Sequence, residues 1–321
     1  MGEFELIRNY FAAAPCAQPG EGVALGIGDD CALLSVAAGE QLAVSTDTLV
    51  AGVHFPDVCD PFLLGQRALG VSASDLAAMG AKPLAFTLAL TLPEVSAAWL
   101  EAFARGLNEM AQGCSMRLIG GDTTKGRLSL TVTVFGSVPA GEALTRGGAR
   151  PADLLCVGGP LGDGAGALPL VLNQRSTEAS TTQALLARYW SPQPQLELGM
   201  ALRGKATSAL DISDGLLADC GHIALASGVR LLIERDKVPM SDALLAFFGA
   251  DEALNAALSG GDDYRLAFTL PASWLATLVD AGWPVFVIGR VVEGQGVALI
   301  DEQGQDVTPL TRGYQHFRET R

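Results

Sequence analysis

Apolar residues recur along this chain in two patterns, alternation typical of strands and the spacing typical of helices, in about equal measure. In the first half, alternating or short apolar runs predict strands, with longer helices between them. The predicted strands cover residues 22–28, 41–50, 84–93, 116–119 and 128–138, and the predicted helices cover residues 61–81 and 96–113. Residues 1–22 are expected to form a short helix followed by a polar loop. Gly120, Gly121 and Asp122 are expected to form a turn where the fourth strand ends.

The second half continues the same mixture of strands and helices. A strand at 153–159 and a glycine-rich turn at 160–168 lead into a helix, and residues 207–228 combine a strand, an acidic turn and a helix. Later elements are a strand at 229–239, a helical pair at 242–259, a strand at 265–270 and a helix at 273–283. The last two strands, 285–294 and 296–304, are predicted to pair as a hairpin.

A stretch rich in Gly, Pro, Arg and Ala at residues 139–153 marks the predicted domain boundary. The chain has 321 residues, about the length of two domains. We therefore predict an α/β protein of mixed α+β type with domains at 1–147 and 148–321.

Composition narrows the classes of partner. Hydrophobic residues make up 49% of the chain, enough for a sizeable core, yet no apolar run approaches the ~20 residues of a membrane span. The net charge of −14 disfavours nucleic acid, and no basic patch compensates for it. The beginning of the chain has no signal-like apolar core, and the six cysteines form no CxxC. We expect a cytoplasmic protein with reduced thiols that binds neither membranes nor nucleic acid.

Six short acidic clusters follow apolar runs and lie among Gly, Ser and Thr. They read GIGDDCA (Asp29, Asp30), STDTL (Asp47), SASDLAAMGA (Asp75), IGGDTT (Asp122), DISDG (Asp211, Asp214) and SGGDDY (Asp262, Asp263). Each aspartate alone is better explained by a helix cap or an Asx-turn than by a metal. Together they favour hard divalent cations, because the chain has only three His and no paired Cys for zinc or iron. Magnesium carrying phosphate is the ligand that this pattern predicts.

Other residues add weaker signals. The hydroxyls of Ser45 and Thr46 can complete a magnesium shell beside Asp47, and Arg146 suits bidentate contact with a phosphate. His54 follows the Asp47 strand, although a lone histidine is more often structural. The glycine-rich turn at 158–166 lacks both the GxxxxGK[ST] and GxGxxG patterns, so it indicates nucleotide binding only weakly.

Nine motifs, in order along the whole chain, resemble the thiamine-monophosphate kinase family. They are GIGDDCALL, STDTLVAGVHF, SDLAAMGAKP, TLALTLPEV, LIGGDTT, ALTRGGARPAD, LDISDGLLADCGHI, LSGGDDY and the terminal GYQHF. The family belongs to the superfamily of aminoimidazole ribonucleotide synthetase, selenophosphate synthetase and the hydrogenase maturation protein HypE. Two departures are visible, since Asp262 stands where the family usually has glutamate and Arg265 stands where an acidic residue is common.

The resemblance implies a two-domain PurM-like architecture. Its N-terminal mixed-sheet domain binds ATP and Mg²⁺ and dimerises, and its C-terminal α/β domain completes the active-site cleft. The implied reaction is ATP-dependent phosphorylation of thiamine monophosphate to thiamine diphosphate by direct in-line transfer, assisted by several Mg²⁺ ions, with ATP as co-substrate and a homodimer as the assembly.

The resemblance also implies the role of each site residue. The magnesium ligands would be Asp30, Ser45, Thr46, Asp47, Asp75, Asp122, Asp211 and Asp214. Contacts to ATP would come from Gly121, Asp122, Arg146 and Ser213, and contacts to thiamine monophosphate from His54, Asp262 and Tyr314. No dedicated general base is expected, because the acceptor phosphate is largely ionised near pH 7.

Two other activities within the superfamily stay open. One is an ATP-dependent ligase that activates an amide or formyl oxygen, as aminoimidazole ribonucleotide synthetase does. The other is a HypE-like maturation factor, which is disfavoured because the sequence given ends in HFRETR without the terminal cysteine motif of HypE.

Overall fold

The computed structural model describes residues 3–18, 20–28, 30–310 and 313–314 of the 321-residue chain. Asp29 and most of the terminal GYQHF motif therefore lie outside the described residues. The chain divides into two compact units. Unit 1 comprises residues 1–77, 81–143 and 190–196, and unit 2 comprises residues 78–80, 144–189 and 197–321. The main division falls at Ala143/Leu144, within the stretch at residues 139–153, and the domain ranges 1–147 and 148–321 stay a prediction.

A four-stranded mixed sheet of order β3-β6-β4-β5 forms the centre of unit 1. Its strands are β3 (Glu40–Val50), β4 (Lys82–Leu92), β5 (Arg117–Lys125) and β6 (Ser129–Pro139). β4 and β5 pair in parallel, and the other neighbours pair antiparallel. A separate antiparallel pair is formed by β1 (Val23–Leu25) and β2 (Leu33–Leu34). The predicted turn at Gly120–Asp122 is wrong, because β5 continues through these residues to Lys125.

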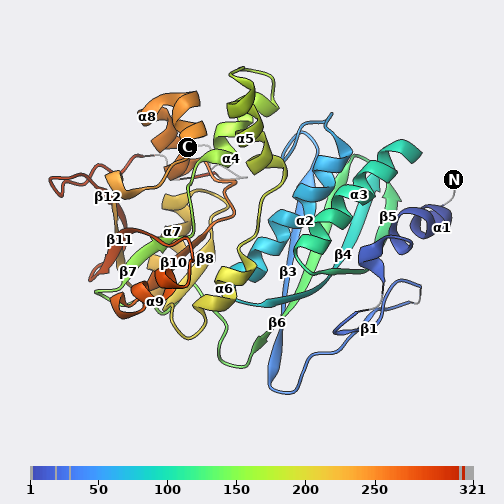
Figure 1. Ribbon diagram of the computed structural model, residues 1–321, viewed down its shortest axis with the longest axis horizontal. Helices are drawn as coiled ribbons and strands as arrows, with labels where there is room; N and C mark the ends of the chain where they lie inside the picture. Colours follow the sequence, from blue (N-terminus) through green and yellow to red (C-terminus); the bar gives the residue numbers. More distant parts are fainter. Residues whose placement is uncertain (1–2, 19, 29, 311–312, 315–321) are drawn as a thin grey trace, which may run out of the picture. The chain divides into compact units, whose positions relative to one another are not determined.

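Helices α2 (Pro61–Ala78) and α3 (Ala97–Gly113) lie over one face of this sheet (Figure 1). The N-terminal segment forms α1 (Glu3–Leu6), the π-helix η1 (Ile7–Ala12) and the short 3₁₀ turn η2 (Pro15–Ala17). Glycines bring α2 and α3 together, since a Cβ on Gly106 would lie 1.8 Å from the carbonyl oxygen of Phe62. This close approach buries the apolar stripes of both helices against the sheet.

The opposite face of the sheet is rich in threonine, and no helix among the described residues covers it in Figure 1. Thr46 of β3 bonds Thr133 of β6, and Thr48 bonds Thr131, each with 2.9 Å between hydroxyl oxygens. Farther along β3 on the same face, Leu42 and Val44 are 44% and 54% exposed. The alternation along β3 therefore separates a half-buried face toward α2 from an open face.

Unit 2 contains a six-stranded mixed sheet of order β12-β9-β11-β7-β10-β8. The strands are β7 (Leu154–Val157), β8 (Ser208–Asp211), β9 (Arg230–Glu234), β10 (Leu266–Leu270), β11 (Phe286–Val292) and β12 (Gly296–Ile300). The predicted hairpin of the last two strands is wrong, because β9 lies between them and pairs with both. The short turn suggested direct pairing, but β12 instead runs parallel to β9.

The helices of unit 2 are α4 (Asp163–Val171), α5 (Ala179–Trp190), α6 (Leu196–Leu202), α7 (Leu216–Ser227), α8 (Asp242–Ser259) and α9 (Leu275–Asp280). Two 3₁₀ turns, η3 (Arg235–Lys237) and η4 (Ala272–Trp274), complete the described elements. The predicted helical pair at 242–259 is confirmed, because α8 consists of two helical segments that meet at Gly249, whose φ of +72° is not helical. Across the described residues, no helix has the length and apolarity needed to cross a membrane.

Candidate active site

Three of the predicted magnesium ligands meet in unit 1, where β3 faces α2. Ser45 and Asp47 are two residues apart on β3, so their side chains point to the same face of the sheet. The Ser45 hydroxyl donates a hydrogen bond to Asp75 Oδ2 on α2. The Ser72 side chain, one turn before Asp75 on α2, forms a hydrogen bond with Asp47. We call these four residues the β3–α2 cluster.

The surroundings of the two carboxylates in the β3–α2 cluster disfavour negative charge. Burial, and then the nearby charge of Asp75, raise the pKa of Asp47 from 3.8 to about 6, against the lowering effect of the Ser72 hydrogen bond. A cation beside the pair would offset both effects. Carboxylate and hydroxyl oxygens are the donors that Mg²⁺ prefers, so the cluster fits this ion.

The side chains of Thr46 and His54 have other partners than the β3–α2 cluster. The Thr46 hydroxyl is on the open sheet face with Thr133, so its backbone carbonyl is the group that remains for a ligand role. His54 lies in the turn after β3, where its Nδ1 accepts a hydrogen bond from the backbone N–H of Val50 at 2.9 Å. The imidazole therefore fixes the conformation of this turn.

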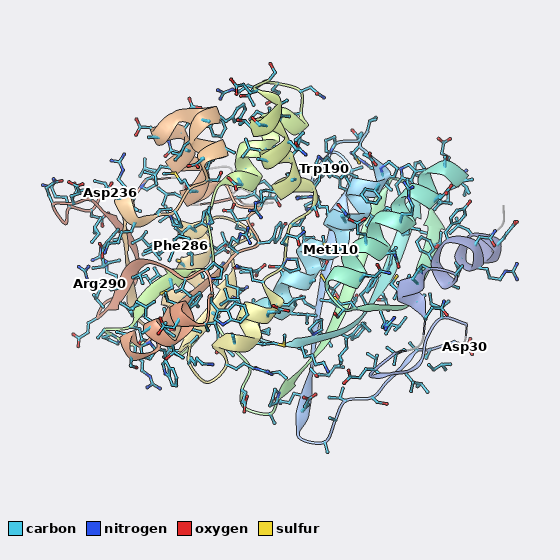
Figure 2. The ribbon with its side chains drawn as sticks, viewed as in Figure 1. Asp30, Met110, Trp190, Asp236, Phe286 and Arg290 are labelled. Carbon is cyan, nitrogen blue, oxygen red and sulfur yellow. The ribbon has the colours of Figure 1, made fainter. Side chains whose placement is uncertain are left out.

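A pocket of about 900 Å³ collects the other acidic residues predicted in unit 1. Asp122 and Gly121 of β5 line it together with Asp30, which lies on the loop between β1 and β2 and is labelled in Figure 2. Much of the remaining wall is apolar, and the π-helix η1 contributes a cation. These residues include Ile7, Arg8, Phe11, Ile27, Cys31 and Leu118.

Gly121 shows why the sequence needs glycine beside Asp122. Its φ is +151°, and a Cβ there would lie 1.8 Å from the carbonyl oxygen of Leu88 on β4. Gly120 is less restricted, because the nearest atom to its ideal Cβ is 3.8 Å away. The second glycine of IGGDTT therefore lets β5 approach β4 closely at the wall of the pocket.

The β3–α2 cluster and the 900 Å³ pocket lie toward opposite edges of the sheet. Asp47 pairs with Val132, Val132 with Leu88, and Leu88 with Gly121, so one row crosses all four strands. Three strand spacings separate the ends of this row by about 14 Å. Among the residues that the structure describes, no three His, Cys, Asp or Glu side chains are grouped closely enough to hold a metal ion. The predicted ligands of unit 1 thus form separate groups, and their metal role stays a prediction.

In unit 2 the structure brings together the loops that carry Ser213, Asp214, Asp262 and Tyr314, whereas Arg146 lies at the opposite end of α7, where Ser227 bonds its carbonyl. Asp211 ends β8, and the loop of Ser213 and Asp214 follows it before α7 begins. The N–H of Asp262 donates to the carbonyl of Ser213 at 2.8 Å, and the N–H of Tyr314 donates to the carbonyl of Asp214 at 3.0 Å. Segments far apart in the sequence therefore converge on the acidic turn.

Asp219, which the sequence interpretation missed, bonds the backbone of this acidic turn. It is buried in the first turn of α7, and its Oδ2 accepts hydrogen bonds from the N–H groups of Ser213, Asp214 and Gly215 at 3.0–3.1 Å. Burial is the main reason why its pKa rises from 3.8 to about 6. An acidic residue in the first turn of an apolar helix was the available signal for this role.

In the glycine-rich turn before α4, a backbone amide also bonds a carboxylate of the same unit. The N–H of Gly162 donates to both oxygens of Asp263, at 2.8 and 3.0 Å. Asp263 is half-buried, and desolvation raises its pKa well above the usual value. The half-buried Arg265 lies nearby, and desolvation lowers its pKa. The amide of Gly162 in this turn thus bonds a side chain of its own unit.

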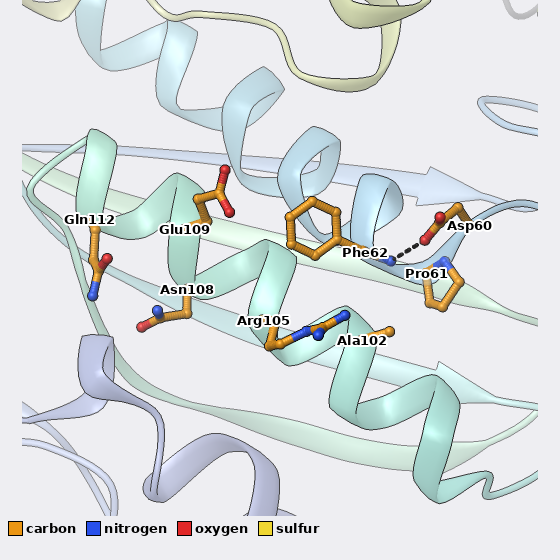
Figure 3. Close-up of a pocket in the computed structure, with 8 residues that line it drawn as sticks. All are labelled: Asp60, Pro61, Phe62, Ala102, Arg105, Asn108, Glu109 and Gln112. Carbon is orange, nitrogen blue, oxygen red and sulfur yellow. Dashed lines mark hydrogen bonds between the residues drawn. The ribbon is translucent and has the colours of Figure 1, made fainter.

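Another hollow, of about 940 Å³, lies between α2 and α3 and contains none of the predicted site residues (Figure 3). Arg105 lies over the Phe62 ring at 5.7 Å, and Asp60 accepts the N–H of Phe62 at 2.8 Å. These contacts show that the residues lining the hollow serve helix packing and helix capping.

Known proteins match this chain over nearly its whole length. Residues 28–138 match the family model "AIR synthase related protein, N-terminal domain", and residues 150–302 match the corresponding C-terminal domain. The chain is 46% identical to thiamine-monophosphate kinase of Escherichia coli K12, over 98% of each chain.

Two solved structures extend this similarity to the fold. A crystal structure of thiamine-monophosphate kinase from Stenotrophomonas maltophilia K279a is 45% identical, with a TM-score of 0.83 over 89% of this chain and 93% of that one. A structure described as "AaThiL complexed with AMPPCP and TMP" is 31% identical, with a TM-score of 0.79 over 88% and 89% of the two chains. By sequence and by fold, the chain belongs to the thiamine-monophosphate kinase family.

Proposed function

We propose that this chain transfers the γ-phosphoryl group of ATP to the phosphate of thiamine monophosphate, which yields thiamine diphosphate and ADP. Membership of the family supplies the substrates. The observation that carries the proposal is the β3–α2 cluster, where Asp47 and Asp75 hold two carboxylates together in a half-buried place. Two neighbouring carboxylates destabilise the folded state unless a cation binds beside them.

The 900 Å³ pocket is the proposed site of the nucleotide. Its volume lies in the range of ligand pockets, and its apolar wall suits a base. Asp122 and the tightly packed Gly121 lie where the phosphates would be held, and Asp30 faces the same pocket. In unit 2, Arg146 and Ser213 are exposed side chains that suit contact with phosphate oxygens.

The proposed magnesium ligands are the residues predicted from the sequence, with the β3–α2 cluster as the best-supported group. When bound, Mg²⁺ neutralises charge on the phosphate oxygens of both substrates. The side chains of this chain then have to position two anions and keep them aligned. His54, Asp262 and Tyr314 are the proposed contacts to thiamine monophosphate, and Asp262 reaches less far than the glutamate usual at this position.

A dedicated general base is absent from the proposal. A phosphate monoester has a second pKa of about 6, so the attacking oxygen carries charge near pH 7. The raised pKa of Asp47, about 6, reflects burial and the charge of Asp75 and needs no proton-transfer role to explain it. Catalysis would then depend on position and charge, as in other phosphoryl transfers.

The open face of the unit 1 sheet is the proposed dimer interface. Leu42 and Val44 leave about half of their surface exposed, and the Thr46–Thr133 and Thr48–Thr131 pairs extend the same flat face. A second copy would cover apolar side chains that otherwise contact water.

The test is a turnover assay with ATP, Mg²⁺ and thiamine monophosphate, with unphosphorylated thiamine as the control acceptor. Chromatography should show thiamine diphosphate and ADP in equal amounts, without inorganic phosphate. Phosphate release or consumption of thiamine alone would contradict the proposal. ATP binding without turnover on either compound would favour a maturation factor instead.

A further inference from the structure

Helix α7 is fixed firmly to the core of unit 2. Its apolar face, which includes Leu216, Cys220 and Ile223, is buried against the sheet and α8. Its 12 residues span about 18 Å from one end to the other. Anything bonded to its two ends is therefore held at a set separation.

The N-terminal end of α7 holds the acidic turn through Asp219. One carboxylate oxygen accepts three successive backbone N–H groups, those of Ser213, Asp214 and Gly215. These bonds fix the backbone of the turn, whereas the Ser213 side chain remains exposed. Asp219 itself is 5% exposed, so it acts from inside the fold.

The C-terminal end of α7 holds a second loop through Ser227. Its hydroxyl accepts the N–H groups of Gly148 and Ala149, both at 3.1 Å, and donates to the carbonyl of Arg146 at 3.2 Å. The neighbouring Ala149 is buried in the same core as α7. The Arg146 side chain, in contrast, is exposed.

We propose that Asp219 and Ser227 are positioning residues, through which α7 sets the placement of Ser213 and Arg146 for the nucleotide. The inference rests on the proposed function, because it takes these two residues as contacts to ATP. Neither Asp219 nor Ser227 needs to touch a substrate. Each fixes a short backbone segment whose exposed side chain is left to bind the phosphates.

Ser227 offers the sharper test, because its replacement leaves the core intact. Ser227→Val removes the hydroxyl, and Ser227→Thr keeps it on a side chain of the same shape as valine. Three hydrogen bonds are lost in the valine variant, so the loop of Arg146 loses its support and a rise of about tenfold in KM for ATP is expected. KM for thiamine monophosphate should change less than about twofold, and Ser227→Thr should restore KM for ATP. Ser180→Val, at an exposed serine on α5, is the matched control.

A double-mutant cycle separates positioning from general stability. If Ser227 acts through Arg146, Ser227→Val should raise KM for ATP about tenfold in the parent but less than about twofold in an Arg146→Ala background. A merely structural role would give the same factor in both backgrounds and would overturn the inference. Equal rises in the two substrate KM values, or no rescue by Ser227→Thr, would also overturn it.

Asp219→Asn and Asp219→Ala provide the second measurement. The amide oxygen can still accept backbone N–H groups, so Asp219→Asn should keep KM for ATP within about threefold, whereas Asp219→Ala should raise it at least tenfold. Failure of the parent enzyme to turn over thiamine monophosphate would refute the proposed function. An active parent whose KM for ATP is unchanged by both Ser227→Val and Asp219→Ala would refute only the positioning role.

Discussion

Replacing Asp47 by asparagine should stabilise the metal-free protein while it removes turnover. The carboxyl has a pKa of about 6 in the folded protein against its ordinary 3.8. Between these two values the folded state holds more protons than the unfolded state, so stability falls as pH rises through this window. Above about pH 6 the full penalty of the buried charge is present.

The size of this penalty follows from the shift. A rise from 3.8 to about 6 corresponds to about 3 kcal/mol at 1.4 kcal/mol per pH unit. Asparagine removes the charge but is itself desolvated, so the gain is smaller than this value. At about 2–4 °C per kcal/mol for a domain of this size, the Tm should rise by several degrees.

Thermal melts in EDTA at pH 7.5 and pH 5 provide the measurement. Asp47→Asn should melt several degrees above wild type at pH 7.5, and the difference should shrink at pH 5, where the wild-type carboxyl is protonated. Asp57→Asn, in an exposed ion pair with Arg127, should differ from wild type by little at either pH. Saturating Mg²⁺ should raise the wild-type Tm more than that of Asp47→Asn, and kcat of the variant should fall by orders of magnitude. A variant that melts at or below the wild-type temperature in EDTA at pH 7.5 would refute the reasoning, as would near-normal turnover.

Three further outcomes are expected. Gly121→Ala should lower turnover at least about 100-fold, because its Cβ collides with the neighbouring strand. Turnover of Gly120→Ala should stay within about threefold of wild type. Kinetic assays and Tm measurements on the two variants check this. Asp263→Asn should lower the Tm less at pH 8 than at pH 5. The pKa of the wild-type carboxyl is raised, so the wild-type protein itself loses stability as pH rises. Equal losses of Tm at both pH values would contradict this expectation. Val44→Asp should convert a dimer into a monomer in light scattering, and Val58→Asp, at a side chain 90% exposed, should not.

Much of the fold follows from local patterns. Alternation along residues 41–50 and 128–138 predicted two strands that the structure contains as β3 and β6, and helical spacing predicted α2 and α3. Pairing was less predictable. The short connection between β11 and β12 suggested a hairpin, but β9 lies between them, because a parallel partner arrives from elsewhere in the sequence.

The site was predicted as a set of residue types rather than as an arrangement. Strand alternation could have placed Ser45 and Asp47 on one face and Thr46 on the other, and the structure has them so. No local pattern could show that Asp75 reaches Ser45, or that Ser227 bonds a loop nearly 80 residues earlier. Such contacts depend on the packing of helices on sheets, which a single sequence does not display.

The number of divalent ions held by the assembled protein tests the central claim most directly. Equilibrium dialysis with Mn²⁺ in place of Mg²⁺, together with a non-hydrolysable ATP analogue and thiamine monophosphate, would count these ions. More than one ion per chain is predicted for wild type and for Asp57→Asn, and at least one fewer for Asp47→Asn. An unchanged count in Asp47→Asn would contradict the assignment of the β3–α2 cluster as a magnesium site.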